Sequence, residues 1–272
     1  MSVVLDLDGP RTTTRRLAQQ AWNARELIAI LARREFFARY RRATLGVIWA
    51  IALPLLQAIV LAVIFTRVAR LPLPGNAFVF VFSGMAAWAF FSAALSAAST
   101  SIVDNSQLSS KIYFPRAALP LVAVASNAFV AVVNVIIVLI AVYASGVDPT
   151  ANVLLLAPGM VLLFALTAVT SALFAALHVY FRDVRYLVQA GLLLAFYLTP
   201  VFYPLSRAPG ALDVIVRINP MTGVIELYRA ATVGADAHYG IAVAISIAWT
   251  LVIGVAAVRM YARFDRVFAD LL

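Results

Sequence analysis

The side chains that usually carry chemistry are few in this chain and stand far apart from one another. Lys111 is the only lysine among 272 residues, and no glycine lies near it. A P-loop requires the pattern Gly-x-x-x-x-Gly-Lys-Ser/Thr, in which the lysine reaches the phosphates. The chain therefore lacks a P-loop. We expect no cofactor in this chain; ATP and Mg²⁺, where the protein uses them, would be bound on a separate subunit.

The two histidines lack the neighbours that catalysis or metal binding needs. His178 and His238 stand near the ends of apolar segments, and the chain has no cysteine. In an enzyme site a base, an acid and a nucleophile must converge, and a metal needs several ligands at suitable spacing. The sequence therefore predicts neither an enzyme nor a metal centre.

Long uncharged segments dominate the chain. A helix needs about 20 apolar residues to cross the hydrocarbon of a bilayer, and six segments of at least 21 residues contain no Asp, Glu, Lys or Arg. Hydrophobic residues make up 64% of the composition and charged residues 12%. We therefore predict an all-α integral membrane protein with six transmembrane helices. The uncharged segments are 43–66, 71–103, 117–147, 149–181, 186–206 and 237–258.

The absence of charge inside these segments also narrows the energy source. Transporters coupled to ions or protons usually place an ionisable residue within a span, at a cost of about 2.5–3.5 kcal/mol or more. No predicted span carries an acidic or basic residue in its middle. The chain has the architecture of a transport path but no residues that could couple it to an energy source. It therefore resembles the permease subunit of a transporter that is powered by another subunit.

The positions of the basic residues predict the orientation. Nine of the 21 Lys and Arg residues precede the first span, and seven more fall in the other segments expected on that side, against five on the opposite side. Cytoplasmic segments carry such an excess, so both termini are expected in the cytoplasm. The formal net charge of +9 then reflects contact with membrane lipids, and we expect no nucleic acid partner.

The layout that follows has four parts. The segment 22–43 mixes arginines with Leu27, Leu31 and Phe36, which predicts an amphipathic helix in the cytoplasmic headgroup region; a soluble helix packed on a partner subunit is a compatible alternative. The first 40 residues are too polar for a cleavable signal peptide, so the first span is expected to be an uncleaved anchor. The parts are a cytoplasmic tail at 1–21, the interfacial helix at 22–43, a six-span domain at 44–262 with spans at about 44–66, 77–98, 117–144, 152–177, 186–204 and 240–260, and a cytoplasmic C-terminus at 263–272.

Between spans five and six the outer segment contains two apolar pieces, 210–218 and 221–233, that are too short to span a membrane. Asn219 is placed as an N-cap and Pro220 as a first-turn proline. We predict two short re-entrant helices dipping into the outer leaflet; a helical hairpin that caps the outer surface without function is the alternative. Pro200 and Pro204 should loosen and end the fifth span, which predicts a hinge.

The cytoplasmic segment 99–116 is the most polar stretch between spans, so energy from another subunit is expected to enter there. A solvated loop between helices is the alternative. The candidate coupling residues are Asp104, Asn105, Leu108, Lys111, Tyr113, Phe114, Pro115 and Arg116.

Several motifs, in this order and spacing, resemble the permeases of type-2 ABC exporters for polysaccharides, which carry O-antigen, capsule, teichoic acid or galactan precursors. The resemblance covers the chain from about Leu27 to the C-terminus. The motifs are Arg39-Tyr40-Arg41-Arg42 leading to Trp49 and Pro54, Phe82-Ser83-Gly84 leading to Trp88-Ala89-Phe90-Phe91, Tyr113-Phe114-Pro115-Arg116, Phe181-Arg182-Asp183-Val184, Thr199-Pro200-Val201-Phe202-Tyr203-Pro204, and Asn219-Pro220 leading to Tyr228-Arg229.

The resemblance implies a homodimer that binds two copies of a cytoplasmic ABC ATPase in the bacterial inner membrane. It implies that the segments 22–42 and 99–116 contact the ATPase and that the short outer helices form a gate. The implied substrate is a glycan on an undecaprenyl- or decaprenyl-type diphosphate carrier. The residues of the outer gate would be Pro200, Pro204, Asn219, Pro220, Tyr228 and Arg229.

A polymer path most naturally lies between two copies, because six helices leave little room for a wide conduit. Aromatic rings offer broad platforms for sugars, with Asn127, Asn134 and Gln189 as polar partners; contact with lipid is the alternative for each ring. Arg39, Arg41 and Arg42 are candidates for holding the lipid diphosphate or ordinary headgroups. The candidate lining residues are Trp88, Phe90, Phe91, Tyr197, Phe202 and Tyr203.

Other functions stay open at this point. A type-2 ABC permease for a drug or a smaller lipid would share the six spans and the dimer. A lipid-modifying membrane enzyme and a scaffold without transport are the remaining classes, and the absence of a catalytic constellation counts against the enzyme.

Overall fold

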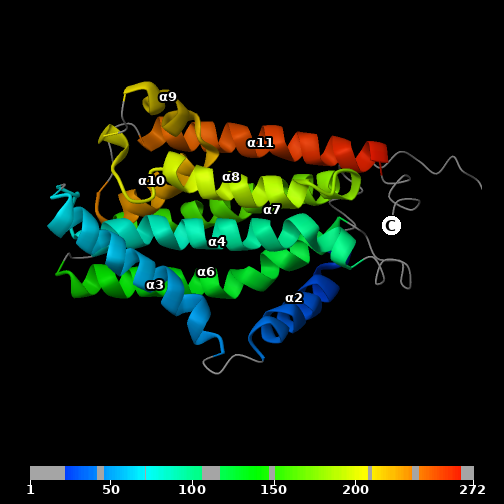
Figure 1. The fold of residues 1–272 in the computed structure, drawn as a ribbon. Helices are drawn as coiled ribbons and strands as arrows, with labels where there is room; N and C mark the ends of the chain where they lie inside the picture. Colours follow the sequence, from blue (N-terminus) through cyan, green and yellow to red (C-terminus); the bar gives the residue numbers. More distant parts are fainter. Residues whose placement is uncertain are drawn as a thin grey trace, which may run out of the picture.

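The computed structural model describes residues 22–41, 46–70, 72–105, 117–146, 151–207, 210–234 and 239–264. Within these ranges all regular elements are helices, which confirms the all-α part of the predicted fold class (Figure 1). The elements are α2 (Arg25–Tyr40), α3 (Ile48–Val63), the π-helical turn η1 (Ile64–Val68), α4 (Ala77–Asp104), α6 (Ala118–Ala144), the 3₁₀ turn η2 (Ala151–Leu155), α7 (Leu156–Tyr180), α8 (Val184–Leu198), the 3₁₀ turn η3 (Leu205–Arg207), α9 (Gly210–Ile218), α10 (Pro220–Thr232) and α11 (Tyr239–Phe264).

Five stretches of these helices are long and apolar enough to cross a membrane, whereas the sequence predicts six. The predicted fifth span corresponds to α8, which has only 15 residues and a length of about 22 Å at 1.5 Å per residue, short of the hydrocarbon thickness of about 30 Å. The helix stops because Thr199 precedes Pro200 and adopts an extended conformation, with φ −101° and ψ 136°; proline disfavours the helical region for the residue before it. The five stretches are Ile48–Val68, Ala77–Asp104, Ala118–Ala144, Asn152–Tyr180 and Tyr239–Ala262.

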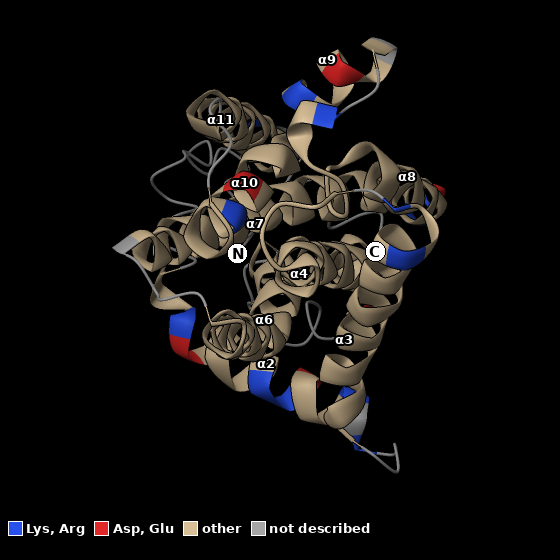
Figure 2. Ribbon diagram, turned by 90° about the vertical axis from the view of Figure 1, so that its left-hand side faces the viewer, with Lys and Arg blue, Asp and Glu red and all other residues tan. Residues whose placement is uncertain are grey.

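Helix α4 is the central element of the bundle. It begins where the Asn76 side chain accepts hydrogen bonds from the backbone N–H groups of Phe78 and Val79, which satisfies donors that the first turn leaves free. It packs against α3, α6, α7, α8 and α10, and the end-on view in Figure 2 places it among these helices. Of its most apolar stretch 78% is buried, against 17% in the stretch that contains α3.

The peripheral helices expose large apolar side chains that a soluble protein would bury. Leu53, Leu56 and Val60 on α3 are about half exposed, and Leu193 and Leu194 on α8 are more than 60% exposed. Exposed apolar area of this extent marks contact with lipid or with another protein. The outer surfaces of α3 and α8 are therefore available to the membrane or to a second copy.

The two short helices predicted between spans five and six are present, but they lie in different environments. Helix α9 keeps Leu212, Val214 and Ile218 more than 40% exposed, and it stands at the edge of the molecule in both views (Figures 1 and 2). Helix α10 is buried at every residue from Met221 to Thr232, packed against α4, α7 and α11. A helix that faces protein on all sides needs no amphipathic pattern. Helix α10 can therefore carry charged and apolar side chains together.

The closest helix contact in this region depends on one glycine. The Gly223 N–H donates a hydrogen bond to Ser246 Oγ of α11 at 3.1 Å. A Cβ atom at this position would overlap the backbone carbonyl of Ala242, so α10 and α11 can approach only because Gly223 has no side chain.

Replacing Gly223 by Ala is expected to lower the free energy of unfolding by at least about 1–3 kcal/mol, the usual cost of overpacking. The matched control is Gly191→Ala on α8, where an added Cβ meets nothing within 4 Å and alanine improves helix propensity by up to about 1 kcal/mol. Thermal unfolding of the detergent-solubilised protein measures both. Equal midpoints for the two variants would contradict the packing described here.

Candidate functional site

A buried ion pair lies on α10. Arg229 Nη1 is 3.0 Å from Glu226 Oε1, and both side chains are 3% exposed. Removing a charge from water costs several kcal/mol even after relaxation, and the partner recovers this only with good geometry and further hydrogen bonds. The remaining partners of Arg229 therefore decide whether this arrangement is stable.

Arg229 also contacts two other segments of the chain. Its Nη2 donates a hydrogen bond to the Val201 carbonyl at 3.1 Å, and its guanidinium carbon lies 3.9 Å from the centroid of the Phe80 ring on α4. A desolvated cation over an aromatic face contributes about 2 kcal/mol. One side chain thus connects α10, α4 and the non-helical segment that follows α8.

The same non-helical segment is held from its other sides. Gly84 of α4 lies so close to it that an added Cβ would stand 2.5 Å from the Val201 carbonyl oxygen. The Asn219 Nδ2 atom donates to Thr199 Oγ1 at 2.9 Å and to the Leu198 carbonyl, the last of α8, at 3.3 Å. We refer to Gly84, Val201, Asn219, Glu226 and Arg229 as the outer clamp.

Asn219 and Pro220 start α10 as the sequence predicts. The Asn219 side chain accepts a hydrogen bond from the Met221 N–H at 2.9 Å, and Pro220 occupies the first turn. One asparagine therefore caps α10 with its oxygen and binds the end of α8 with its nitrogen. Replacement by Asp would keep the cap but lose the contacts that the amide nitrogen donates, and replacement by Leu would lose both.

The electrostatics of the clamp follow from burial. Burial lowers the pKa of the Arg229 guanidinium, and the adjacent Glu226 carboxylate opposes this effect; arginine nevertheless stays protonated in proteins. A charged guanidinium is thus retained inside the bundle, on a helix that belongs to none of the five long spans.

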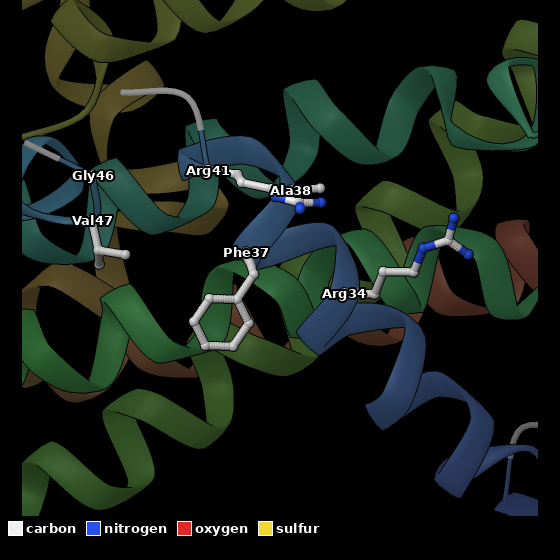
Figure 3. Close-up of a pocket in the computed structure, with 6 residues that line it drawn as sticks. All are labelled: Arg34, Phe37, Ala38, Arg41, Gly46 and Val47. Atoms are coloured by element: carbon white, nitrogen blue, oxygen red, sulfur yellow. The ribbon is translucent and has the colours of Figure 1, made fainter. Parts of the chain in front are cut away.

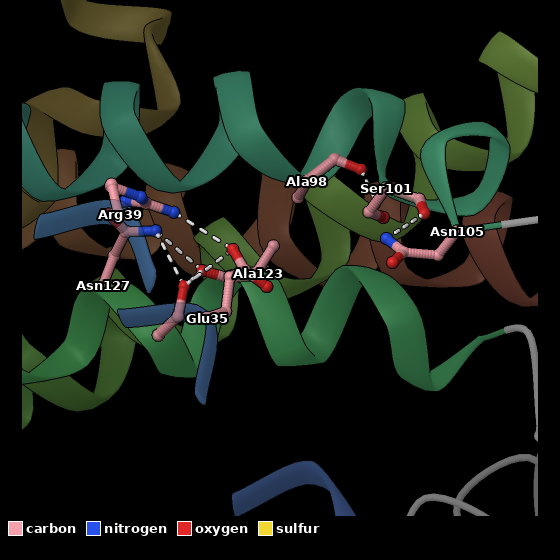
Figure 4. A network of polar contacts seen from close by, with 8 residues as sticks. Glu35, Arg39, Ala98, Ser101, Asn105, Ala123 and Asn127 are labelled. Carbon is pink, nitrogen blue, oxygen red and sulfur yellow. Dashed lines mark hydrogen bonds and ion pairs between the residues drawn. The ribbon is translucent and has the colours of Figure 1, made fainter. Parts of the chain in front are cut away.

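A second polar cluster joins α2 to α6 (Figure 4). Arg39 Nη1 donates to Asn127 Oδ1 at 2.8 Å, and Arg39 Nη2 lies 3.0 Å from Glu35 Oε1. Ser126 Oγ donates to the same Glu35 oxygen at 3.1 Å. We refer to Glu35, Arg39, Ser126 and Asn127 as the inner cluster. The rings of Phe36 and Phe129 pack edge to face beside it, with centroids 5.1 Å apart.

Of the predicted coupling residues, the structure describes only Asp104 and Asn105, at the end of α4. Asp104 is the last residue of α4, and Asn105 follows it with its Nδ2 atom donating to the Ser101 carbonyl at 2.9 Å, as Figure 4 shows. This bond satisfies a carbonyl of the last helical turn. The other members, Leu108, Lys111, Tyr113, Phe114, Pro115 and Arg116, lie outside the described residues.

The three arginines predicted to hold lipid phosphates fall in different positions. Arg39 belongs to the inner cluster, where Glu35 and Asn127 occupy two of its nitrogen atoms. Arg41 is exposed and lines a hollow beside α2 (Figure 3). Arg42 lies outside the described residues. Arg41 is therefore the member whose surroundings suit a phosphate.

The predicted lining aromatics divide into a buried and an accessible group. Trp88, Phe90 and Phe91 are 3–7% exposed and pack inside the protomer, with the Phe90 ring centroid 4.5 Å from that of Phe164 on α7. Tyr197 is 60% exposed. Within one protomer only the group near the outer end of α8 reaches the surface, and it consists of Tyr197 together with the partly buried Phe202 and Tyr203.

Sequence reasoning missed Glu226 and the partners of Arg229. It counted Arg229 only as one of the five basic residues on the outer side, although Glu226 stands three residues before it, a spacing at which two side chains of one helix meet. It also singled out Phe82-Ser83-Gly84 without the reason for the glycine, which is the approach of Val201. The signal that was present is an opposite-charge pair at that spacing in a short apolar helix.

The fold and these two clusters define a multi-pass helical membrane protein in which charged groups tie helices together, and no group of three potential metal-ligating side chains occurs in the part of the chain described. Residues 26–233 match the family model described as ABC-2 type transporter. The chain belongs to the ABC-2 type transporter family.

Named relatives agree with this assignment. The chain is 33% identical over 217 residues to the O-antigen export system permease protein RfbA of Myxococcus xanthus, covering 79% of this chain and 83% of the relative. It is 31% identical over 210 residues to the protein of the same name in Klebsiella pneumoniae, covering 75% and 79%. The chain is a multi-pass permease component of the bacterial inner membrane without an ATPase site of its own.

Arg229→Met is expected to destabilise the protein by about 3–5 kcal/mol, because it leaves Glu226 buried without this cation. The double variant Glu226→Gln/Arg229→Met is expected to lose much less than the sum of the single variants. The control is the pair Asp213 and Arg217 on α9, 2.8 Å apart but 35–41% exposed, whose removal should cost at most about 1 kcal/mol. Unfolding in detergent gives all values, and strict additivity would contradict a coupled pair.

Asn127→Leu is expected to loosen α2 from α6, since Arg39 then loses its contact across the two helices. Trypsin should cleave the arginine-rich α2 several-fold faster in vesicles that expose it. Gln57→Leu, at an exposed position of α3, removes an amide from another apolar helix and should leave the cleavage rate unchanged. Equal rates for both variants would show that the inner cluster does not hold α2.

Proposed function

We propose that this chain is the membrane-spanning subunit of an ATP-driven exporter that moves a lipid-linked polysaccharide from the cytoplasmic to the outer side of the inner membrane. Two copies form the channel, and two copies of a cytoplasmic ABC ATPase supply the energy. The observation that carries the proposal is the 33% identity over 79% of the chain to a protein named as an O-antigen export permease. An undecaprenyl- or decaprenyl-type diphosphate is the carrier we expect.

The packing of a single protomer supports a path between two copies. Helix α4 fills the centre of the bundle and contacts five other helices, so a wide conduit within one protomer would have to displace it. The exposed apolar surfaces of α3 and α8 and the exposed ring of Tyr197 face outward instead. Tyr197, Phe202 and Tyr203 then become the lining candidates nearest such an interface.

A sixth crossing and a cytoplasmic position of both termini complete the proposed topology. In Figure 1 helix α8 runs alongside α4, which it contacts, and the segment 199–207 extends from its end. We assign the crossing to α8 and this segment together, because α8 alone is shorter than the hydrocarbon. Helices α9 and α10 are then the two short re-entrant helices on the outer side.

Helix α4 offers a mechanical link between the ATPase side and the outer clamp. It is continuous over 28 residues, or about 42 Å at 1.5 Å per residue. Asp104 and Asn105 lie at one end, next to the segment expected to bind the ATPase, while Phe80 and Gly84 lie near the other end against Arg229 and Val201. Movement imposed on the coupling segment would therefore reach the clamp through one rigid element.

The deciding experiment reconstitutes the permease with its ATPase in vesicles that carry a lipid-linked glycan in the leaflet facing the ATPase. Transfer of the glycan to the other leaflet, measured with a membrane-impermeant glycosidase, should require ATP and both subunits. Transfer driven by a pH or sodium gradient alone would refute the proposal. Efflux of a small lipid or drug with no glycan transfer would favour the alternative permease class.

Pro200→Ala is expected to reduce the amount of glycan exported per ATP hydrolysed several-fold. Alanine lets α8 continue past Leu198, which removes the non-helical segment that Arg229 and Asn219 hold. Pro158→Ala, at an exposed position in the first turns of α7, is the matched control and should leave this ratio unchanged. Unaltered coupling in the Pro200 variant would exclude a hinge here.

A further inference from the structure

We propose that the crevice between α2, the start of α3 and α6 binds one anionic phospholipid of the cytoplasmic leaflet, and that this lipid holds α2 in place. The inference concerns a resident lipid and does not depend on the identity of the exported substrate. Its evidence is a pair of connected hollows with basic side chains at their rim and aromatic side chains in their walls. Figure 3 shows the first of them.

The crevice consists of two hollows of about 610 and 640 Å³, within the range of small-molecule sites in proteins. Phe37 and Val47 line both, so one occupant can extend from the first hollow into the second. The first is lined by Arg34, Phe37, Ala38, Arg41, Gly46 and Val47. The second is lined by Ala29, Ala32, Arg33, Phe36, Phe37, Val47, Ala125, Ser126 and Phe129.

The charged part of the crevice matches a lipid phosphate. Arg34, Ala38 and Arg41 follow one another at intervals of four and three residues on α2, which places them on one side of the helix. Arg33 contributes a third guanidinium, 5.8 Å from the centroid of the Phe37 ring. Among the residues that line the two hollows, no side chain is acidic. Guanidinium groups bind phosphate through paired hydrogen bonds.

The apolar part of the crevice matches an acyl chain. Phe36, Phe129 and Val47 line the second hollow, and the two phenylalanine rings pack edge to face where α2 meets α6. A free phosphate ion would leave these walls in contact with water. An amphiphile with a phosphate headgroup fills both parts, and basic residues near the cytoplasmic surface attract anionic lipid.

The neighbours of the second hollow favour a lipid that stays over one that passes through. Ser126 lines the second hollow and also donates to Glu35, which pairs with Arg39. The occupant would therefore lie next to the inner cluster that fastens α2 to α6. A lipid in this position adds contact to an attachment made otherwise by the inner cluster, the Phe36–Phe129 pair and the apolar packing of Ala32 and its neighbours on α2 against α6.

The test measures phosphatidylglycerol binding to the full-length chain in mild detergent by native mass spectrometry, with phosphatidylcholine as the neutral comparison. The wild type should retain one phosphatidylglycerol per chain in preference to phosphatidylcholine. Arg34→Gln/Arg41→Gln should weaken this binding about tenfold or more. Arg67→Gln/Arg207→Gln, at two exposed arginines outside the crevice, changes the net charge equally and should leave the binding unchanged.

A second variant separates a built crevice from general attraction between charges. Ala38→Trp fills the first hollow without altering any charge, and it should displace the phosphatidylglycerol by a similar factor. In vesicles, phosphatidylglycerol should slow tryptic cleavage of α2 in the wild type but not in the Ala38 variant. Retained binding in this variant, equal affinity for phosphatidylcholine, or stoichiometric displacement by a lower concentration of polyprenyl diphosphate would each overturn the proposal, the last in favour of a substrate site.

Discussion

The buried guanidinium of Arg229 is the constraint on which the outer half of this permease depends. A cation that is 2% exposed must be surrounded by groups that replace water, and here these are a carboxylate, a backbone carbonyl and an aromatic face. The carbonyl is free to accept because Pro200 interrupts α8 just before it. Gly84 in turn lets that backbone lie directly on α4. The helix break at Pro200, the glycine at position 84 and the buried charge of Arg229 form one arrangement, and each would destabilise the protein without the other two.

The inner end of the molecule is held by weaker forces. The Glu35–Arg39 pair is 32–37% exposed, so water screens it and its contribution is small, while the Glu226–Arg229 pair is almost fully desolvated. Breaking the outer clamp leaves an uncompensated charge, whereas separating α2 from α6 returns partly hydrated polar groups to water and exposes the apolar contacts that Ala32 makes with α6. The electrostatic cost of moving α2 is therefore the smaller of the two, which suits an element expected to follow a partner subunit.

The features of this fold that depend on neighbouring residues could be predicted from the sequence, whereas those that depend on contacts with distant segments could not. Asn219 and Pro220 announce the start of α10 because capping depends on neighbouring residues only, and the helix bounds Gly210–Ile218 agree with the prediction. The uncharged segments located the long helices. The uncharged segment around Tyr197 nevertheless overestimated the length of α8, because hydropathy alone does not show that Pro200 ends the helix. The position of Arg229 depends on Glu226 and Phe80, and that of Arg39 depends on Asn127. Hydropathy and charge counts treat each residue separately and do not detect such pairs.

The burial of α10 explains how a bundle of apolar helices can transmit force to its outer end. Apolar contacts between helices are non-directional, so a helix sliding in lipid meets little specific resistance. A charged hydrogen bond has a defined length and angle, and Arg229 makes one to the backbone beyond α8 and a stacked contact to α4. A displacement of α4 must therefore either carry the segment 199–203 and α10 with it or expose a desolvated charge. The second outcome is strongly unfavourable, so in the proposed exporter the clamp would convert a movement of α4 into a concerted movement of the outer segments.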